Sequence, residues 1–170
     1  MRTAIIYYSM NGNTAMAAKK LADELKADML EIAPEKAYPN HGVRKFLWGG
    51  KSAVMAETPK LKPYSFHPDN YDQVIFGFPV WASNVAPPIR TFVKENRERL
   101  RDKQIAAFAC QSGNGAEKAF ARLLDSLGRD AFRATMILID PKDKPNAETD
   151  QKISMMVKIL DERQQNGDDE

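Results

Sequence analysis

The chain has 170 residues, of which 43% are hydrophobic, and this is enough to bury one core, so a single domain over residues 1–170 is expected. The formal net charge is only +2 and the basic residues are interspersed with acidic ones, which argues against nucleic acid as a partner. The sequence shows neither the apolar core of a signal peptide nor a membrane-spanning stretch, and it has one cysteine, so a cytoplasmic protein without a membrane span is expected.

The first predicted strand, over residues 3–8, leads through a polar segment into a helix. That segment consists of Ser9, Met10, Asn11, Gly12, Asn13 and Thr14. A helix start offers unpaired N–H groups and the positive end of the macrodipole, and the hydroxyl groups add donors, so the segment predicts a phosphate-binding loop. It contains no Lys or Arg and matches neither the Walker motif nor Gly-x-Gly-x-x-Gly, which indicates a monophosphate held by neutral donors. The alternative is an ordinary Asn-Gly turn capped by Thr14.

A short strand is predicted over residues 29–32, followed by a connection over residues 34–68 that is rich in proline and basic residues. This connection contains an amphipathic piece with Val43, Phe46 and Leu47 at helical spacing. The third strand covers residues 73–78 and is expected to end at Pro79, while Gly77 within it is expected to allow a helix to pack closely.

The remaining pattern is a helix from residue 87, a strand over 104–110, a helix before residue 128, a strand over 134–139 and a helix over 147–163. Short apolar runs that alternate with helical periodicity predict an α/β fold, with five strands in a doubly wound parallel sheet and helices on both faces. Ligands of such sheets bind at the carboxyl ends of the strands.

Two further loops at this edge are polar and nearly uncharged. The loop after the third strand consists of Pro79, Val80, Trp81, Ala82, Ser83 and Asn84, and the loop after the fourth consists of Gln111, Ser112, Gly113, Asn114 and Gly115. A ring-shaped ligand can lie between these loops, with Trp81 on its face and backbone amides at its polar edge. Considered alone, Trp81 is equally consistent with a half-buried packing residue. Residues 111–115, considered alone, are consistent with an ordinary tight turn.

The three loops together resemble those of short-chain flavodoxins, and the resemblance covers essentially the whole chain. The first loop is similar to the phosphate motif of this family, and residues 79–82, followed by Pro87 and Pro88, resemble the second flavin loop of a bacterial branch. The resemblance implies the flavodoxin-like strand order 2-1-3-4-5 and FMN as cofactor. It also implies phosphate contacts from Ser9, Asn11, Asn13 and Thr14, stacking by Trp81, and ring contacts from residues 79–84 and 111–115.

The chain departs from the family's pattern at its flavin loops. Many members sandwich the flavin between two aromatic residues, but residues 111–115 contain none, so one flavin face is expected to be open unless Phe46 or Trp48 covers it. Ala82 stands where many flavodoxins have a glycine, and a positive φ at a non-glycine residue costs roughly 1–2 kcal/mol.

Three functions remain open. The resemblance implies an FMN-binding electron-transfer protein, a monomer or weak homodimer, that meets redox partner proteins or a small-molecule electron acceptor. The alternative is an FMN-dependent NAD(P)H or quinone oxidoreductase, which an open flavin face favours. A non-redox binding module on the same fold is the least supported, because the aspartate cluster and lysine of receiver domains are missing. The flavin would carry the chemistry, so no catalytic residue is expected, and His41 and His67 match no metal spacing.

Overall fold

The computed structural model describes residues 1–39 and 57–161. Its strands are β1 (Thr3–Tyr7), β2 (Asp28–Glu31), β3 (Gln73–Trp81), β4 (Asn84–Val85), β5 (Gln104–Gln111) and β6 (Thr135–Ile139). Its helices are α1 (Asn13–Leu25), η1 (Pro68–Asn70), α3 (Pro87–Asn96), η2 (Arg97–Leu100), α4 (Ala116–Leu127) and α5 (Ala147–Asp161). The predicted amphipathic piece with Val43, Phe46 and Leu47, and Trp48 beside it, lie outside the described residues. None of the described helices is long and apolar enough to cross a bilayer.

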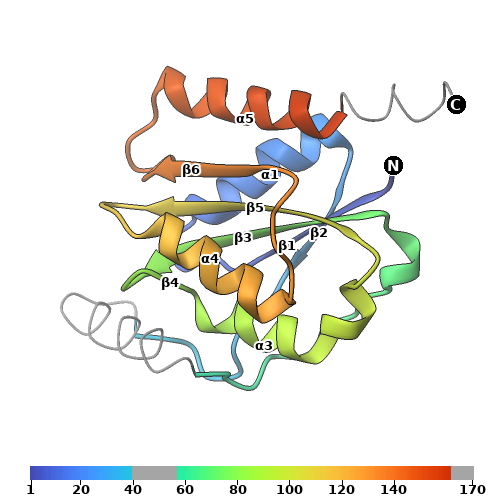
Figure 1. Ribbon diagram of the computed structural model, residues 1–170. Coiled ribbons are helices and arrows are strands. Elements are labelled where there is room, and N and C mark those ends of the chain that lie inside the picture. Colours follow the sequence, from blue (N-terminus) through green and yellow to red (C-terminus); the bar gives the residue numbers. More distant parts are fainter. Residues whose placement is uncertain (40–56, 162–170) are drawn as a thin grey trace, which may run out of the picture.

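Five strands form a parallel sheet in the order β2-β1-β3-β5-β6, and the short β4 pairs antiparallel with the end of β3 (Figure 1). Because β4 is not one of the parallel strands, this is the predicted order 2-1-3-4-5, and the predicted doubly wound α/β fold is confirmed. The parallel strands all run in one direction, so the loops after β1, β3, β5 and β6 leave the sheet at the same edge.

Helices cover both faces of the sheet. α1 and α5 lie on one face and α3 and α4 on the other (Figure 1). Neighbouring residues of one strand enter different cores: Ile75 packs in the core of the α1 and α5 face, while Phe76 packs in that of the α3 and α4 face. Both residues are fully buried. Burial on both faces explains why these strands read as continuous apolar runs without alternation.

The prediction that Pro79 ends the third strand is wrong. β3 continues to Trp81, and Pro79 stands opposite Cys110 of β5. Pairing with β1 ends at Gly77 and pairing with β4 begins at Val80, so Pro79 falls between the two partners on the other side of β3. A proline is tolerated at this position because no neighbouring strand there requires its missing N–H.

Candidate functional site

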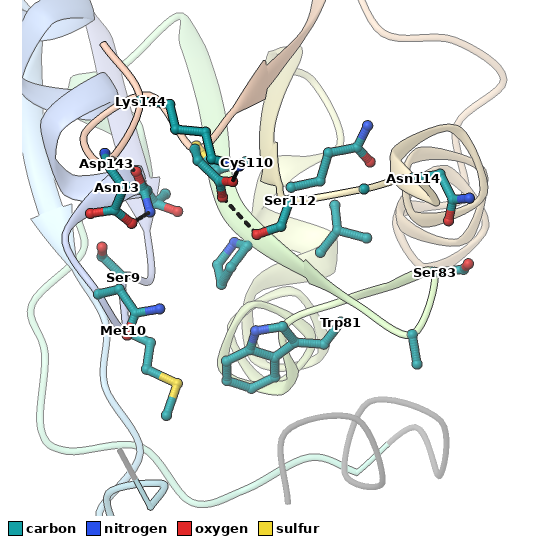
Figure 2. A pocket seen from close by; sticks show the side chains of 18 residues that line it. Ser9, Met10, Asn13, Trp81, Ser83, Cys110, Ser112, Asn114, Asp143 and Lys144 are labelled. Carbon is teal, nitrogen blue, oxygen red and sulfur yellow. Dashed lines mark hydrogen bonds and ion pairs between the residues drawn. The ribbon is translucent and has the colours of Figure 1, made fainter. Parts of the chain in front are cut away.

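The three predicted loops line one cavity of about 640 Å³ at the carboxyl ends of β1, β3 and β5. Figure 2 shows Ser9 and Asn13 on one side of it, Trp81 below, and Ser112 and Asn114 on the other side. The predicted residues that line it are Ser9, Met10, Asn11, Asn13, Thr14, Pro79, Val80, Trp81, Ala82, Ser83, Gln111, Ser112, Gly113 and Asn114. Gly12, Asn84 and Gly115 belong to the same loops but are not among the lining residues.

The first loop is held by its own serine. Ser9 Oγ accepts hydrogen bonds from the backbone N–H groups of Gly12, at 3.2 Å, and of Ala15, at 3.1 Å. Gly12 makes the turn into α1 with a φ of 93°, a conformation that favours glycine. Since Ser9 Oγ uses its lone pairs as acceptors, its O–H remains available as a donor to a ligand. Asn13 and Thr14 begin the helix, and within the described part of the chain their amides have no acceptor.

The second loop is a tight hairpin turn under backbone strain. Trp81 pairs with Asn84, and the two residues between them, Ala82 and Ser83, have φ values of 48° and 60°. Positive φ at both central positions is typical of a type I′ turn, which favours Asn and Gly. The buried Asn84 side chain supports the turn by donating to the Ala82 carbonyl at 3.2 Å, and Arg122 donates to the Ser83 carbonyl at 3.1 Å.

This strain predicts that Ala82→Asn stabilises the protein by about 0.5–1 kcal/mol, because asparagine adopts the left-handed conformation at lower cost than alanine. Urea unfolding monitored by circular dichroism measures the change. Ala147→Asn is the control, because Ala147 is exposed at the start of α5. Ala86 is fully buried and therefore does not serve as a control. An unchanged or lower stability in Ala82→Asn would mean that the turn is not strained as described.

The orientation of Trp81 is set by two tyrosines. Its ring packs edge-to-face against Tyr8, with centroids 5.8 Å apart, and against Tyr38, with centroids 5.3 Å apart. Among the described residues Trp81 is the one aromatic side chain that lines the cavity. Edge-to-face contacts of this kind leave the indole little freedom to rotate.

The third loop approaches the second at a glycine. Gln111 Oε1 accepts from the Ala116 N–H at 3.0 Å and so caps α4. Gly115 has a φ of 103°, and a Cβ there would lie 2.9 Å from Ser83 Cα. Glycine at this position therefore lets the two loops meet.

Four lining residues were missed at the sequence level: Cys110, Asp140, Asp143 and Lys144. Asp140 accepts from Ser112 Oγ at 2.6 Å and pairs with Lys144 Nζ at 3.0 Å, and Asp143 accepts from Asn13 Nδ2 at 2.9 Å. Three of them follow β6, whose carboxyl end opens at the same edge as β5. The polar segment directly after the last predicted strand was the signal that could have found them.

Burial raises the pKa of the Cys110 thiol from its ordinary value of 9.0 to about 12, with a partial offset from a hydrogen bond with Thr14 and a smaller contribution from Asp140 that raises it. At pH 8 the folded chain is expected to react with Ellman's reagent about 10³-fold more slowly than the chain unfolded in urea, because only the thiolate is nucleophilic. The raised pKa also stabilises the fold below about pH 9, and this contribution is lost as the pH rises toward 12. Equal reaction rates in the two states would contradict the burial of this thiol.

Comparisons with known proteins match this architecture. The family model described as Flavodoxin matches residues 2–148. A flavoprotein from Lactobacillus acidophilus NCFM, solved in complex with FMN, is 21% identical with a TM-score of 0.68, over 89% of this chain and 97% of that one. Two-electron reduced Megasphaera elsdenii flavodoxin is 14% identical with a TM-score of 0.57, over 92% and 96%.

The flavodoxin of Streptococcus pneumonia TIGR4 is 16% identical with a TM-score of 0.54, over 96% of this chain and 99% of that one. At these identities the structural likenesses establish the fold. No curated protein matches the sequence. The family match over residues 2–148 confirms the resemblance, and the chain belongs to the flavodoxin family.

Proposed function

We propose that this chain is an FMN-binding electron-transfer protein. The observation that carries the proposal is that one cavity of about 640 Å³ joins an uncharged donor loop at one end to an indole at the other. FMN has a monophosphate at one end and an aromatic ring system at the other. The flavoprotein of Lactobacillus acidophilus was solved in complex with this molecule.

The first loop fits the phosphate. The amides of Asn13 and Thr14 stand without acceptors in the described part of the chain, at the positive end of α1, and the Ser9 hydroxyl is free to donate. Groups of this kind bind anions through hydrogen bonds and the helix macrodipole. A bound phosphate would accept hydrogen bonds from these unused donors.

The other two loops fit the ring system. Trp81 offers an aromatic side chain, and residues 79–83 and 111–114 line the cavity around it. Bound FMN would supply the redox chemistry. The chain's own residues would bind the two ends of the molecule, orient the ring against Trp81 and limit the access of water to it.

Titration of the purified apoprotein with FMN tests the proposal. One equivalent of FMN is expected to bind, with shifted flavin absorption bands and quenched flavin fluorescence. The reduced protein is then expected to pass its electrons to an acceptor protein such as cytochrome c, and to oxidise NADPH only when a separate reductase is added. An unshifted flavin spectrum at saturating protein would overturn the assignment.

An FMN-dependent NAD(P)H or quinone oxidoreductase is a second candidate, favoured by one observation. Ser112, Gly113 and Asn114 contribute no aromatic ring, and Trp81 is the one aromatic side chain on the described wall. An uncovered ring face admits a nicotinamide or a quinone. Steady oxidation of NADPH with a quinone, without any added reductase, would favour this candidate over the carrier.

A further inference from the structure

A cationic side chain from a distant part of the sequence lies against the first loop. Lys142 Nζ donates to the Asn11 carbonyl at 2.9 Å, and the Lys142 backbone N–H donates to Asn13 Oδ1 at 2.8 Å. The side chain passes so close to Gly12 that a Cβ on this glycine would lie 3.1 Å from Nζ. The ammonium group is therefore held beside the loop by contacts at both ends of the lysine.

The charge of Lys142 is not neutralised by an ion pair in residues 1–39 and 57–161. Lys144, two residues on, differs because it pairs with Asp140 at 3.0 Å. The neighbouring residue Asp143 carries the opposite charge. Its carboxylate accepts a hydrogen bond from Asn13 Nδ2 at 2.9 Å. Lys142 and Asp143 thus place two opposite charges beside an otherwise neutral loop.

Lys142 lies beside the main cavity and does not line it. It lines a separate hollow with Met16, Lys20 and Pro141 and is not among the residues of the main cavity. A phosphate monoester carries a charge of about −1.5 to −2 at pH 7. Because Lys142 is exposed, its attraction for this charge is closer to the value in water than to that in the protein interior.

We propose that Lys142 is a specificity-determining residue of the flavin site, whose charge favours phosphorylated FMN over uncharged riboflavin. This inference rests on the proposed binding of FMN. The first loop supplies the hydrogen bonds, and Lys142 supplies a positive charge that the loop's own sequence lacks. Asp143 opposes it.

Dissociation constants for FMN and riboflavin, measured by quenching of flavin fluorescence, test the proposal. Lys142→Gln is expected to weaken FMN binding about fivefold to tenfold and to change riboflavin binding less than about twofold. Lys142→Arg is expected to keep the preference, and Asp143→Asn to tighten FMN binding. The effect of Lys142→Gln is expected to shrink as the salt concentration rises from about 0.05 M to about 0.5 M, because the charges are screened.

Lys19→Gln is the matched control, since it removes the same charge from the exposed side of α1, where Lys19 pairs with Asp23. Equal preference for FMN over riboflavin in the wild type and in Lys142→Gln would overturn the inference while leaving FMN binding intact. Equal weakening of both flavins would also overturn it, because Lys142 would then only support the shape of the loop. If the wild type bound no FMN, the proposed function would fail first and this inference with it.

Discussion

Replacing Gly77 with alanine is expected to lower the free energy of unfolding by about 3 kcal/mol. Gly77 lies in the middle of β3 opposite Phe108 of β5, and a Cβ on Gly77 would lie 2.2 Å from Phe108 Cζ. The Phe108 ring is fully buried, so it cannot move aside without disturbing the core beneath α1 and α5. Overpacking of this kind forces side chains off their rotamers or strands apart.

Urea unfolding monitored by circular dichroism measures the effect. Gly113→Ala is the matched control, because a Cβ there meets nothing within 4 Å, and its stability is expected to change by less than about 0.5 kcal/mol. In a second background, Phe108→Leu, the added methyl group of Gly77→Ala is expected to cost less than in the wild type, because the smaller side chain leaves room for it. An alanine at Gly77 that costs no more than one at Gly113 would show that the ring does not occupy this space.

The contact of Gly77 with Phe108 is a feature that the sequence could not predict. A glycine inside a strand predicts room for a helix, whereas the space beside Gly77 is filled by the ring of Phe108 from the neighbouring strand, 31 positions along the chain. This contact depends on the register between β3 and β5, and nothing local to Gly77 specifies it. The continuation of β3 through Pro79 has the same origin, because it depends on where β1 ends.

The strands and the three loops were predictable because each rests on local patterns, whereas the strand order followed only from the resemblance to the flavodoxin family. Buried apolar runs identify parallel strands, and a polar loop after such a run falls at the edge where the carboxyl ends meet. The contribution of residues 140–144 could not be predicted in the same way, because it depends on contacts between distant parts of the chain. Their side chains reach the site through Asn13 and Ser112, which lie far away in the sequence.

Replacing Ser9 with aspartate is expected to weaken FMN binding by about 10³-fold and to leave the fold intact. A carboxylate oxygen at this position can still accept from the N–H groups of Gly12 and Ala15, and a negative charge suits the start of α1. The same charge repels the phosphate of FMN. Two unit charges about 4 Å apart at an effective dielectric constant of about 20 interact by roughly 4 kcal/mol, which corresponds to about 10³ in the dissociation constant.

Ser9→Asn is the control for size, because asparagine matches aspartate in shape, accepts the same two hydrogen bonds and carries no charge. Binding of FMN and of riboflavin is compared in the two variants, together with the thermal midpoint of each apoprotein. We expect Ser9→Asp to lose FMN far more than Ser9→Asn does, to bind riboflavin about as well as Ser9→Asn, and to melt no lower than it. Equal losses of FMN in both variants would place the phosphate elsewhere, because repulsion by the new charge requires the anion to lie beside Ser9.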